Sequence, residues 1–451
     1  MSGAKTAATV TRPLAILLFA AVFALAAAAP ARAVSLLRDA DIEYALGALA
    51  QPVLQAAGLS PSQVQIVLVH DSSLNAFIVD PTAIYIHSGL ILKLESPEAL
   101  QAVIAHEAAH ITNGHITRRL GNMRSARTAS ALGMALAAAT GAATGSGDAA
   151  FGVLLGTQSA AMRNFLAHTR AEESSADITS VRTLARAGID PAGAIEVQEL
   201  FRGQEALSAG RQDPYMRSHP LTTDRLRTLK GLVAAAGPAA PRNAEAAYWF
   251  ARARAKLEAF LRAPKWTLGR LDRLPSKDIA LMAEAAARHQ QSDLKGAQRA
   301  IDGAIALRPR DPYYYDLKGQ ILLESRQAAA AVKVYSQARS LAPRNAQILA
   351  GLGRAQLAAG QTSAALQTLE EARGRDWRDA RVLRDLSVAY AQGGNAGMAS
   401  EATAQRYALG GRLKDAGIHA KRATDLLPRG SAPWRRAQDV LDAAERAKAT
   451  R

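Results

Sequence analysis

A repeat of 34 residues in the C-terminal half constrains the fold of this chain more than any other feature. The stretches 307–339 and 341–373 align without a gap, and small residues and a Pro recur at matched positions. The matched pairs are Leu307 and Leu341, Pro309 and Pro343, Gly319 and Gly353, and Ala338 and Ala372, with Ala285 and Ala304 one period upstream of Gly319 and Ala338. Small residues at a fixed period suit helices that cross closely, so the pattern predicts stacked helical pairs.

The repeat resembles the tetratricopeptide repeat, which has this period and consists of two helices. About three units are recognisable, and the flanking helices diverge from the pattern. Asp376 and Trp377 stand where a further Pro is expected, and Pro428 ends a later helix. A chance helical bundle is the alternative, which the joint recurrence of Pro and small residues disfavours. We expect a repeat domain over 276–451, after a linker and connecting helices over 236–275.

The N-terminus has the layout of a secretory signal peptide. Lys5 and Arg12 precede an apolar run over 14–29, and residues 31–33 read Ala-Arg-Ala, as at a cleavage site. A retained membrane anchor is the alternative, but the run is short for one. We therefore predict a cleavable signal peptide over 1–33 and a mature chain outside the cytoplasm.

The formal net charge of the whole chain is +16, which favours contact with anionic surfaces such as lipid headgroups, lipopolysaccharide or acidic proteins. Nucleic acid is the poorest candidate, and we expect none as a partner. The chain is exported, and its Lys and Arg residues are scattered rather than clustered with aromatic residues.

Between the signal peptide and a Pro/Ala/Gly stretch over 233–244 lies a segment of mixed secondary structure. Residues 37–58 have helical periodicity, and the β-branched runs 63–70 and 83–89 predict short strands. A further helix is expected after Ser96, which is suited to cap it and is followed by a Pro at the first helical position.

That helix carries the sequence AHEAAHITNGH over 105–115. His106 and His110 are four residues apart, so they lie on one helical face, within reach of one metal ion. Glu107 stands where a carboxylate can take a proton from a metal-bound water. Three polar residues on an ordinary helix are the alternative. The chain contains no Cys, so a metal must be held by His, Asp or Glu.

A zinc site needs a third protein ligand. His115 is one position away from the third His of metzincins, so we expect it to be a bystander at the helix end. A second predicted helix offers Glu172 and Glu173. Glu173 shares a face with Asp177, which lets Glu173 bind metal while Asp177 accepts the outward N–H of a ligating His. Glu172 is expected on a solvated face.

A loop after this helix places His219 before Pro220, with Arg225 six residues further on. A His-Pro pair is usually only a loop feature. If His219 and Arg225 converge on the metal, they can stabilise an oxyanion, or His219 can occupy the open zinc position. The other histidines are read as structural or surface residues: His70, His87, His168, His289 and His419.

Residues 126–168 are rich in Ala, Gly and Thr and poor in charge. The first interpretation is a buried helical hairpin against the His-containing helix. The second is a mobile lid or a peripheral membrane contact through 129–161, whose apolar runs are short for a membrane span.

Together, these motifs closely resemble the HtpX/Ste24-like zinc metallopeptidases, a gluzincin family. With the signal peptide and the repeats, the chain is most similar to BepA-type periplasmic proteases of Gram-negative bacteria. The motifs are HEAAH at 106–110, EESSAD at 172–177, NAF at 75–77 and SHPLTTDRL at 218–226. The resemblance implies a mainly α protein. An α+β zincin-like metallopeptidase domain with a small β-sheet over 34–235 would precede an α-helical tetratricopeptide solenoid.

The resemblance also implies one Zn²⁺ per chain, bound by His106, His110 and Glu173. Glu107 would be the general base, and Asp177 matches an acidic residue that is sometimes assigned as proton donor.

By the same resemblance, His219 matches a loop His that can cap the zinc in a resting, self-inhibited state. Asn75, Ala76 and Phe77 match the segment leading to an edge strand on which substrate aligns by β-augmentation. We expect the scissile peptide to be held along the strand near 83–87.

One departure from the family pattern is Ser175, where an acidic residue often stands. The implied substrates are misassembled outer-membrane proteins, and the repeats would dock substrate or the outer-membrane assembly machinery. The alternative is a chaperone or assembly adaptor that acts through its repeats, with a capped or rarely active zinc site.

Overall fold

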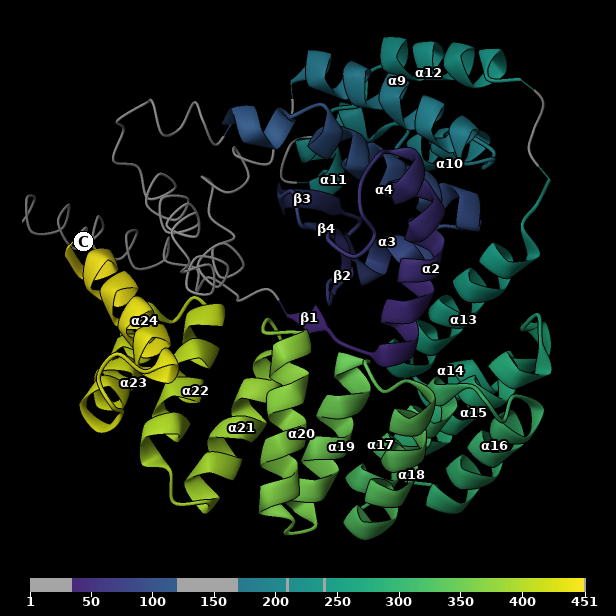
Figure 1. The fold of residues 1–451 in the computed structure, drawn as a ribbon. Helices are drawn as coiled ribbons and strands as arrows, with labels where there is room; N and C mark the ends of the chain where they lie inside the picture. Colours follow the sequence, from purple (N-terminus) through teal and green to yellow (C-terminus); the bar gives the residue numbers. More distant parts are fainter. Residues whose placement is uncertain (1–34, 120–168, 208–210, 238–240, 450–451) are drawn as a thin grey trace, which may run out of the picture.

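The computed structural model describes residues 35–119, 169–207, 211–237 and 241–449 (Figure 1). The N-terminal domain, taken here as the described residues up to 235, has two α-helical layers beside a small sheet. Its elements are β1 (Leu36–Leu37), α2 (Ala40–Ala56), β2 (Gln65–Val69), β3 (Ala76–Asp80), β4 (Ala83–His87), α3 (Ser88–Lys93), α4 (Pro97–Thr112), α9 (Arg170–Arg186), α10 (Ala192–Leu200), a 3₁₀ turn (Gln204–Ala206), α11 (Pro214–Ser218) and α12 (Thr223–Ala235).

The second half of the described chain is helical and curves beneath the N-terminal domain (Figure 1). It begins with α13 (Ala244–Leu261), α14 (Pro264–Leu268) and a 3₁₀ turn (Leu271–Arg273). The repeat domain then comprises α15 (Lys277–Gln290), α16 (Leu294–Leu307), α17 (Pro312–Glu324), α18 (Ala328–Leu341), α19 (Ala346–Ala358), α20 (Thr362–Arg375), α21 (Ala380–Gln392), α22 (Ala396–Leu409), α23 (Leu413–Leu426) and α24 (Ala432–Ala449). A mainly α fold with a small sheet and a helical repeat domain is confirmed.

The predicted close crossings of the repeat helices are present. A Cβ on Gly319 would stand 2.7 Å from the ring of Tyr335 on the paired helix, and one on Gly353 would stand 2.6 Å from Leu369. Ala338 and Ala372, the other small residues of the repeat, are fully buried. The small residues therefore recur because each lies where one helix of a pair crosses the next.

The sheet has the strand order β1-β2-β4-β3. The β4 strand is parallel to β2 and antiparallel to β3, with Phe77 opposite Tyr85. The expectation that substrate aligns along 83–87 is therefore wrong, because β4 has a partner strand on both sides. The strands β1 and β3 form the two edges of the sheet, and the NAF segment runs into β3, of which Ala76 and Phe77 are the first two residues.

Both faces of the sheet are covered. Ala76, Ile78 and Ile84 face the core that contains α2 and α4. Val79 and Tyr85, on the other face, pack against Leu383 of α21 and Leu409 of α22. The repeat domain is therefore not a separate appendage, because it completes the burial of this sheet.

Helix α13 also joins the two domains. Phe250 and Leu257 on this helix belong to the N-terminal core, whereas Ala255 belongs to the first repeat core. Its Arg252 is fully buried and pairs with Asp41 at 2.8 Å and with Asp311 at 2.5 Å. Removing one partner would leave a buried charge uncompensated, so these pairs fix how the domains pack.

The predicted signal peptide, the predicted hairpin over 126–168 and the alternative membrane contact through 129–161 lie outside the described residues. Among the helices of the described part of the chain, none is long and apolar enough to cross a membrane.

Candidate metal centre

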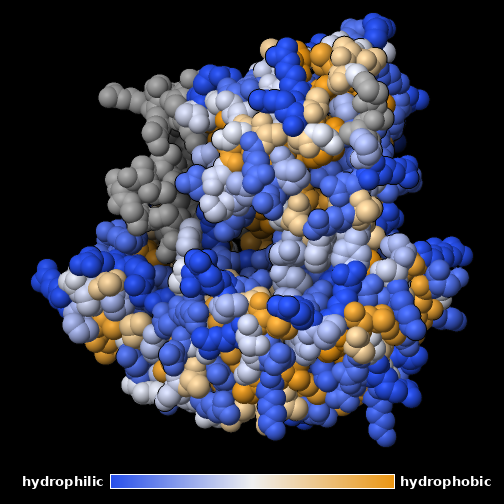
Figure 2. Space-filling model, turned by 45° about the vertical axis from the view of Figure 1, so that its right-hand side comes forward, coloured by the Kyte–Doolittle hydropathy of each residue, from blue (hydrophilic) through white to orange (hydrophobic). Residues whose placement is uncertain are grey.

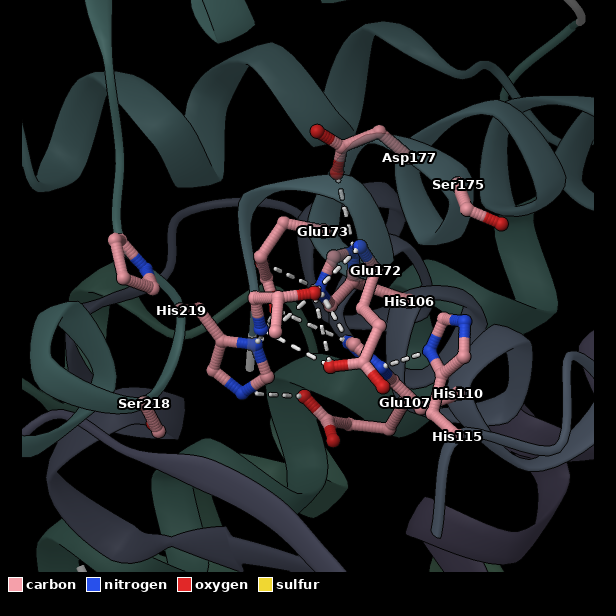
Figure 3. A network of polar contacts seen from close by, with 12 residues as sticks. His106, Glu107, His110, His115, Glu172, Glu173, Ser175, Asp177, Ser218 and His219 are labelled. Carbon is pink, nitrogen blue, oxygen red and sulfur yellow. Dashed lines mark hydrogen bonds and ion pairs between the residues drawn. The ribbon is translucent and has the colours of Figure 1, made fainter. Parts of the chain in front are cut away.

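Two helices and one loop bring together four side chains that could bind a metal ion. Helix α4 provides His106 and His110, α9 provides Glu173, and His219 follows α11 (Figure 3). One potential ligand atom from each lies within 4.8 Å of the other three, and all four side chains are buried. Local capping residues determine where both helices begin. Ser96 accepts a hydrogen bond from the third residue of α4, and Thr169 forms a capping box with Glu172 on α9.

The spacing of the donor atoms fits a tetrahedral metal. The Nε2 atoms of His106 and His110 are 3.1 Å apart. Each lies 3.4 Å from an oxygen of Glu173. Zinc ligands at about 2.0–2.1 Å in tetrahedral geometry stand about 3.3 Å from one another. The three side chains predicted as ligands therefore already have the mutual spacing that a zinc ion requires.

His219 reaches the same cluster from the loop after α11, whereas the other three side chains come from α4 and α9. Its Nδ1 lies 2.9 Å from Glu173 Oε1 and 3.4 Å from His106 Nε2. Its Nε2 lies 3.3 Å from Glu107 Oε1, and the ring of Tyr215 packs against it with centroids 4.5 Å apart. His219 thus lies between the ligands and the predicted base, where it can occupy the fourth metal position.

Asp177 contacts the outer nitrogen of His106, one of the predicted ligands, as expected from the helical spacing. Its Oδ1 lies 3.1 Å from His106 Nδ1, which leaves His106 Nε2 directed at the metal position. Burial alone would raise the pKa of Asp177, but the hydrogen bonds and charge of Arg225 outweigh it and hold this pKa below its ordinary value. Asp177 therefore remains an acceptor for His106.

Arg225 is buried and binds two carboxylates. Its Nε and Nη2 donate to the two oxygens of Asp177 at 2.5 and 2.9 Å, and its Nη1 lies 2.7 Å from Glu173 Oε2. The sequence suggested that Arg225 faces an oxyanion. In the structure its guanidinium is instead directed at Glu173 and Asp177, where it neutralises part of the negative charge of the cluster.

Glu107 is the predicted general base, and it is fully buried next to His106. Burial raises its pKa, an effect that the charges of His219 and His106 oppose. Within the described part of the chain, neither carboxylate oxygen accepts a hydrogen bond, although His219 Nε2 is close to Oε1. A buried carboxylate without such a bond is costly, which is typical of a group that acts on a bound molecule.

His115 is not a bystander, which corrects the sequence interpretation. Its Nδ1 lies 2.8 Å from His110 Nδ1, on the side of the ring away from the metal position. Gly114 adopts a left-handed conformation (φ +69°) that ends α4 and turns the chain back, bringing His115 beside His110. In a neutral pair one ring must donate to the other, so His115 fixes the tautomer of His110.

Glu172 and Ser175 lie outside the metal cluster. Glu172 pairs with Arg119 at 2.8 Å and closes the capping box of α9, which agrees with its rejection as a ligand. Ser175 accepts a hydrogen bond from Asn113 at 3.0 Å and thereby ties α9 to the end of α4. The departure from the family pattern at Ser175 therefore affects a contact between helices and leaves the cluster of four potential metal ligands intact.

The segment that carries His219 also contacts the beginning of the edge strand. Asp213 Oδ1 accepts from the backbone N–H of Leu74 at 3.4 Å, and the N–H of Tyr215 donates to the carbonyl of Leu74 at 3.2 Å. The next residue, Asn75, turns its carbonyl to β4, where it accepts from the N–H of His87 at 2.9 Å. Ala76 and Phe77 therefore lie on the edge strand, and Asn75 lies immediately before it, next to the His219 segment.

Most remaining histidines have the structural or surface positions expected for them. His87 is buried and lies 3.0 Å from Ser73 Oγ, and His289 pairs with Glu324 at 2.6 Å on the repeat domain. His70 is exposed, and His419 packs against Tyr407. His168 lies outside the described residues.

Comparisons with known proteins match two separate parts of the chain. Residues 37–233 match a family described as peptidase family M48, and residues 322–386 match the tetratricopeptide repeat. The beta-barrel assembly-enhancing protease of Escherichia coli strain K12 is 24% identical over 320 residues, which cover 68% of this chain and 63% of that protein.

Two further relatives have related names. The putative beta-barrel assembly-enhancing protease of Vibrio cholerae is 31% identical over 159 residues, covering 35% of this chain and 32% of that protein. The beta-barrel assembly-enhancing protease of Yersinia pestis is 23% identical over 270 residues, covering 59% of this chain and 55% of that protein. The matches thus span less than two thirds of each relative.

Proposed function

We propose, from the premise that this chain joins a peptidase family M48 domain to tetratricopeptide repeats, that it is a zinc-dependent endopeptidase of the periplasm. The observation that carries the proposal is the convergence of His106, His110 and Glu173 at distances of 3.1 to 3.4 Å. This donor set, two imidazoles and one carboxylate, is one that catalytic zinc sites use.

In this proposal His106, His110 and Glu173 hold one Zn²⁺. The bound ion supplies Lewis-acid chemistry, polarising the scissile carbonyl and acidifying a water. Asp177 and His115 orient the two ligand imidazoles through their outer nitrogens.

Glu107 acts as general base and then as general acid. It takes a proton from the attacking water and returns it to the leaving amine, which completes hydrolysis of the peptide bond. Its raised pKa favours such a role, because a carboxylate that titrates nearer neutral pH is a more effective base. Asp177, which contacts His106 and Arg225, is assigned a positioning role rather than that of proton donor.

Substrate is proposed to bind as an added strand along the outer edge of β3, beginning at Asn75, Ala76 and Phe77. His219 is proposed to restrain the resting enzyme, because its Nδ1 lies within the ligand cluster and its Nε2 beside Glu107. Displacing the Asp213–His219 segment would release both the fourth metal position and the contacts at Leu74.

The proposed substrates are misfolded or misassembled envelope proteins, in particular outer-membrane proteins. This rests on the names of the relatives, which are beta-barrel assembly-enhancing proteases. The repeat domain is proposed to dock substrate or the assembly machinery, as tetratricopeptide repeats bind proteins.

The second candidate is an assembly adaptor in which the repeats act and the metal site stays capped. The position of His219 favours it. Complementation of a deletion strain separates the two functions: full rescue by Glu107→Gln supports the adaptor, and failure of this variant supports the peptidase.

The direct test compares wild type with Glu107→Gln on an unfolded protein such as casein, with zinc content measured in both. The variant should bind zinc as wild type does and lose cleavage by about two to four orders of magnitude. Glu98→Gln, on the first turn of the same helix, is the matched control and should cleave normally. Equal cleavage by Glu107→Gln and wild type would refute the mechanism.

A further inference from the structure

The edge strand β3 directs alternate side chains to two different parts of the molecule. Ala76 and Ile78 enter the core of the N-terminal domain, on the side of α4. Phe77 and Val79 lie on the opposite face, in a cluster with Leu409 of the repeat domain. Phe77 is only half-buried there and stacks on Tyr85, with ring centroids 5.2 Å apart.

The backbone of β3 leaves hydrogen-bonding groups on its outer edge. Asn75 directs its carbonyl to β4, so in an antiparallel pair the alternate residues Leu74, Ala76 and Ile78 direct theirs outward. The contacts of Leu74 agree with this alternation of inward and outward backbone groups. Its N–H donates to the Asp213 side chain, and its carbonyl accepts from the N–H of Tyr215. Among the strands of the described residues, none pairs with this edge.

The repeat helices follow the sheet from one edge to the other. Arg38, next to β1, pairs with Asp376 at the end of α20. Leu383 of α21 and then Leu409 of α22 contact the face formed by β4 and β3. The helices α23 and α24 lie farther along the repeat domain, after α22 (Figure 1). The space-filling view shows a hollow between the two domains with hydrophobic residues inside it (Figure 2).

We propose that the repeat domain forms one wall of the substrate cleft, and that Phe77 is a specificity-determining residue that receives an apolar side chain from every second substrate residue. Leu409, which is buried behind this wall, is a positioning residue that supports Phe77. A residue directly opposite Phe77 in an added strand would project to the same face as Phe77, toward α22. This inference rests on the proposed endopeptidase function and on substrate binding at β3.

The two walls of such a cleft differ in chemistry. Toward α4, the side that bears Glu107 and His219 is polar and charged. Toward the repeats, Phe77 and Leu409 are apolar. The class of substrate that fits is an extended polypeptide with apolar residues at alternate positions, the pattern of an amphipathic β-strand. A shift by one residue would place a polar side chain on the apolar wall.

Cleavage sites in a regular peptide test the inference. The zinc-loaded full chain is incubated with a long peptide in which Leu and Ser alternate, and the products are identified by mass spectrometry. Cleavage is expected at every second bond, with a preference of about tenfold over the intervening bonds, because moving to the next bond shifts the strand by one residue. A scrambled peptide of the same composition should lose this regularity.

Two variants test whether the repeat domain causes the preference for cleavage at every second bond. Leu409→Gln and the milder Leu409→Ala should each reduce the preference to about twofold or less. Ile418→Gln, at an exposed residue of α23, should keep it. Because the readout is a ratio of two bonds in one peptide, partial unfolding of a variant does not change it.

The outcomes distinguish failure of the inference about the substrate cleft from failure of the proposed endopeptidase function. Equal cleavage of adjacent bonds by wild type overturns the inference and leaves the peptidase function standing. An alternation that persists in both Leu409 variants also overturns it, since the metal side alone would then set the preference. Failure of the wild type to cleave this peptide or casein in a Glu107-dependent manner refutes the proposed function itself.

Discussion

The imidazole of His219 bridges Glu173 and Glu107: its Nδ1 lies 2.9 Å from Oε1 of the first and its Nε2 lies 3.3 Å from Oε1 of the second. One side chain therefore contacts both a proposed metal ligand and the proposed base. In the proposed enzyme, a group in this position would compete with substrate for the metal and with water for the base.

Replacing His219 should accelerate cleavage. If the capped form dominates at rest, His219→Ala is expected to raise kcat/KM for an unfolded protein on the order of tenfold, because the competent fraction rises. Zinc content should stay at the level of wild type. His289→Ala, on the repeat domain, is the control. A lower kcat at unchanged zinc content would instead assign His219 to stabilisation of the transition state.

Asp177→Asn should weaken metal binding. The change removes the charged acceptor of His106 and leaves Arg225 with one carboxylate fewer, so zinc affinity should fall about 10- to 100-fold. Titration with a competing chelator measures it. Glu172→Gln is the matched control on the same helix, because Gln can also close the capping box. Equal affinities of the two variants would contradict the role of Asp177.

His115 should support the metal site through His110. His115→Ala removes the contact at Nδ1 and is expected to lower zinc affinity about tenfold, while His115→Gln, which can still hydrogen bond, should retain most of it. The same chelator titration applies, and circular dichroism checks that α4 is intact. If both variants bind zinc as wild type does, His115 has only a packing role.

Asp316 should make the contact between the N-terminal domain and the repeat domain sensitive to pH. It is buried on α17, and burial raises its pKa from 3.8 to about 7, with Lys256 and Arg381 opposing and Asp39 and Asp41 reinforcing the rise. The folded state therefore retains a proton that the unfolded state releases between these pH values. Stability from this group is present below about pH 4 and is lost as the pH rises through about 7.

The variant Asp316→Asn cannot ionise and should avoid this loss. Its melting temperature is expected to exceed that of wild type by several degrees at pH 8, and by less at pH 4.5, in thermal unfolding of the full chain. Asp302→Asn, at an exposed residue of α16, should show no such dependence. A difference between variant and wild type that is the same at both pH values would show that Asp316 does not titrate in this range.

Helical parts of the site could be predicted from the sequence because their signals are local. The spacing of His106 and His110 and that of Glu173 and Asp177 need only a helix, and Ser96 marks where the first helix begins. The pairing of Asp177 with His106 follows from that spacing once α4 and α9 pack together.

Contacts that depend on chain reversal or strand pairing were not predictable in this way. The return of His115 to His110 needs the left-handed turn at Gly114. The order of the strands is non-local, so β3 was missed as a strand and β4 was mistaken for the edge. The binding of Arg225 to Asp177 and Glu173 likewise depends on how a distant loop folds back.

The face of the sheet that packs on α21 and α22 has a consequence for how such a protein can be divided. A chain cut after α12 would expose Val79 and Tyr85, now almost completely buried, beside Phe77 and an open strand edge. An apolar sheet face next to a free edge is prone to self-association. The solubility of the N-terminal domain thus depends on the repeat domain, and recombination could exchange the repeats only together with the sheet residues they cover.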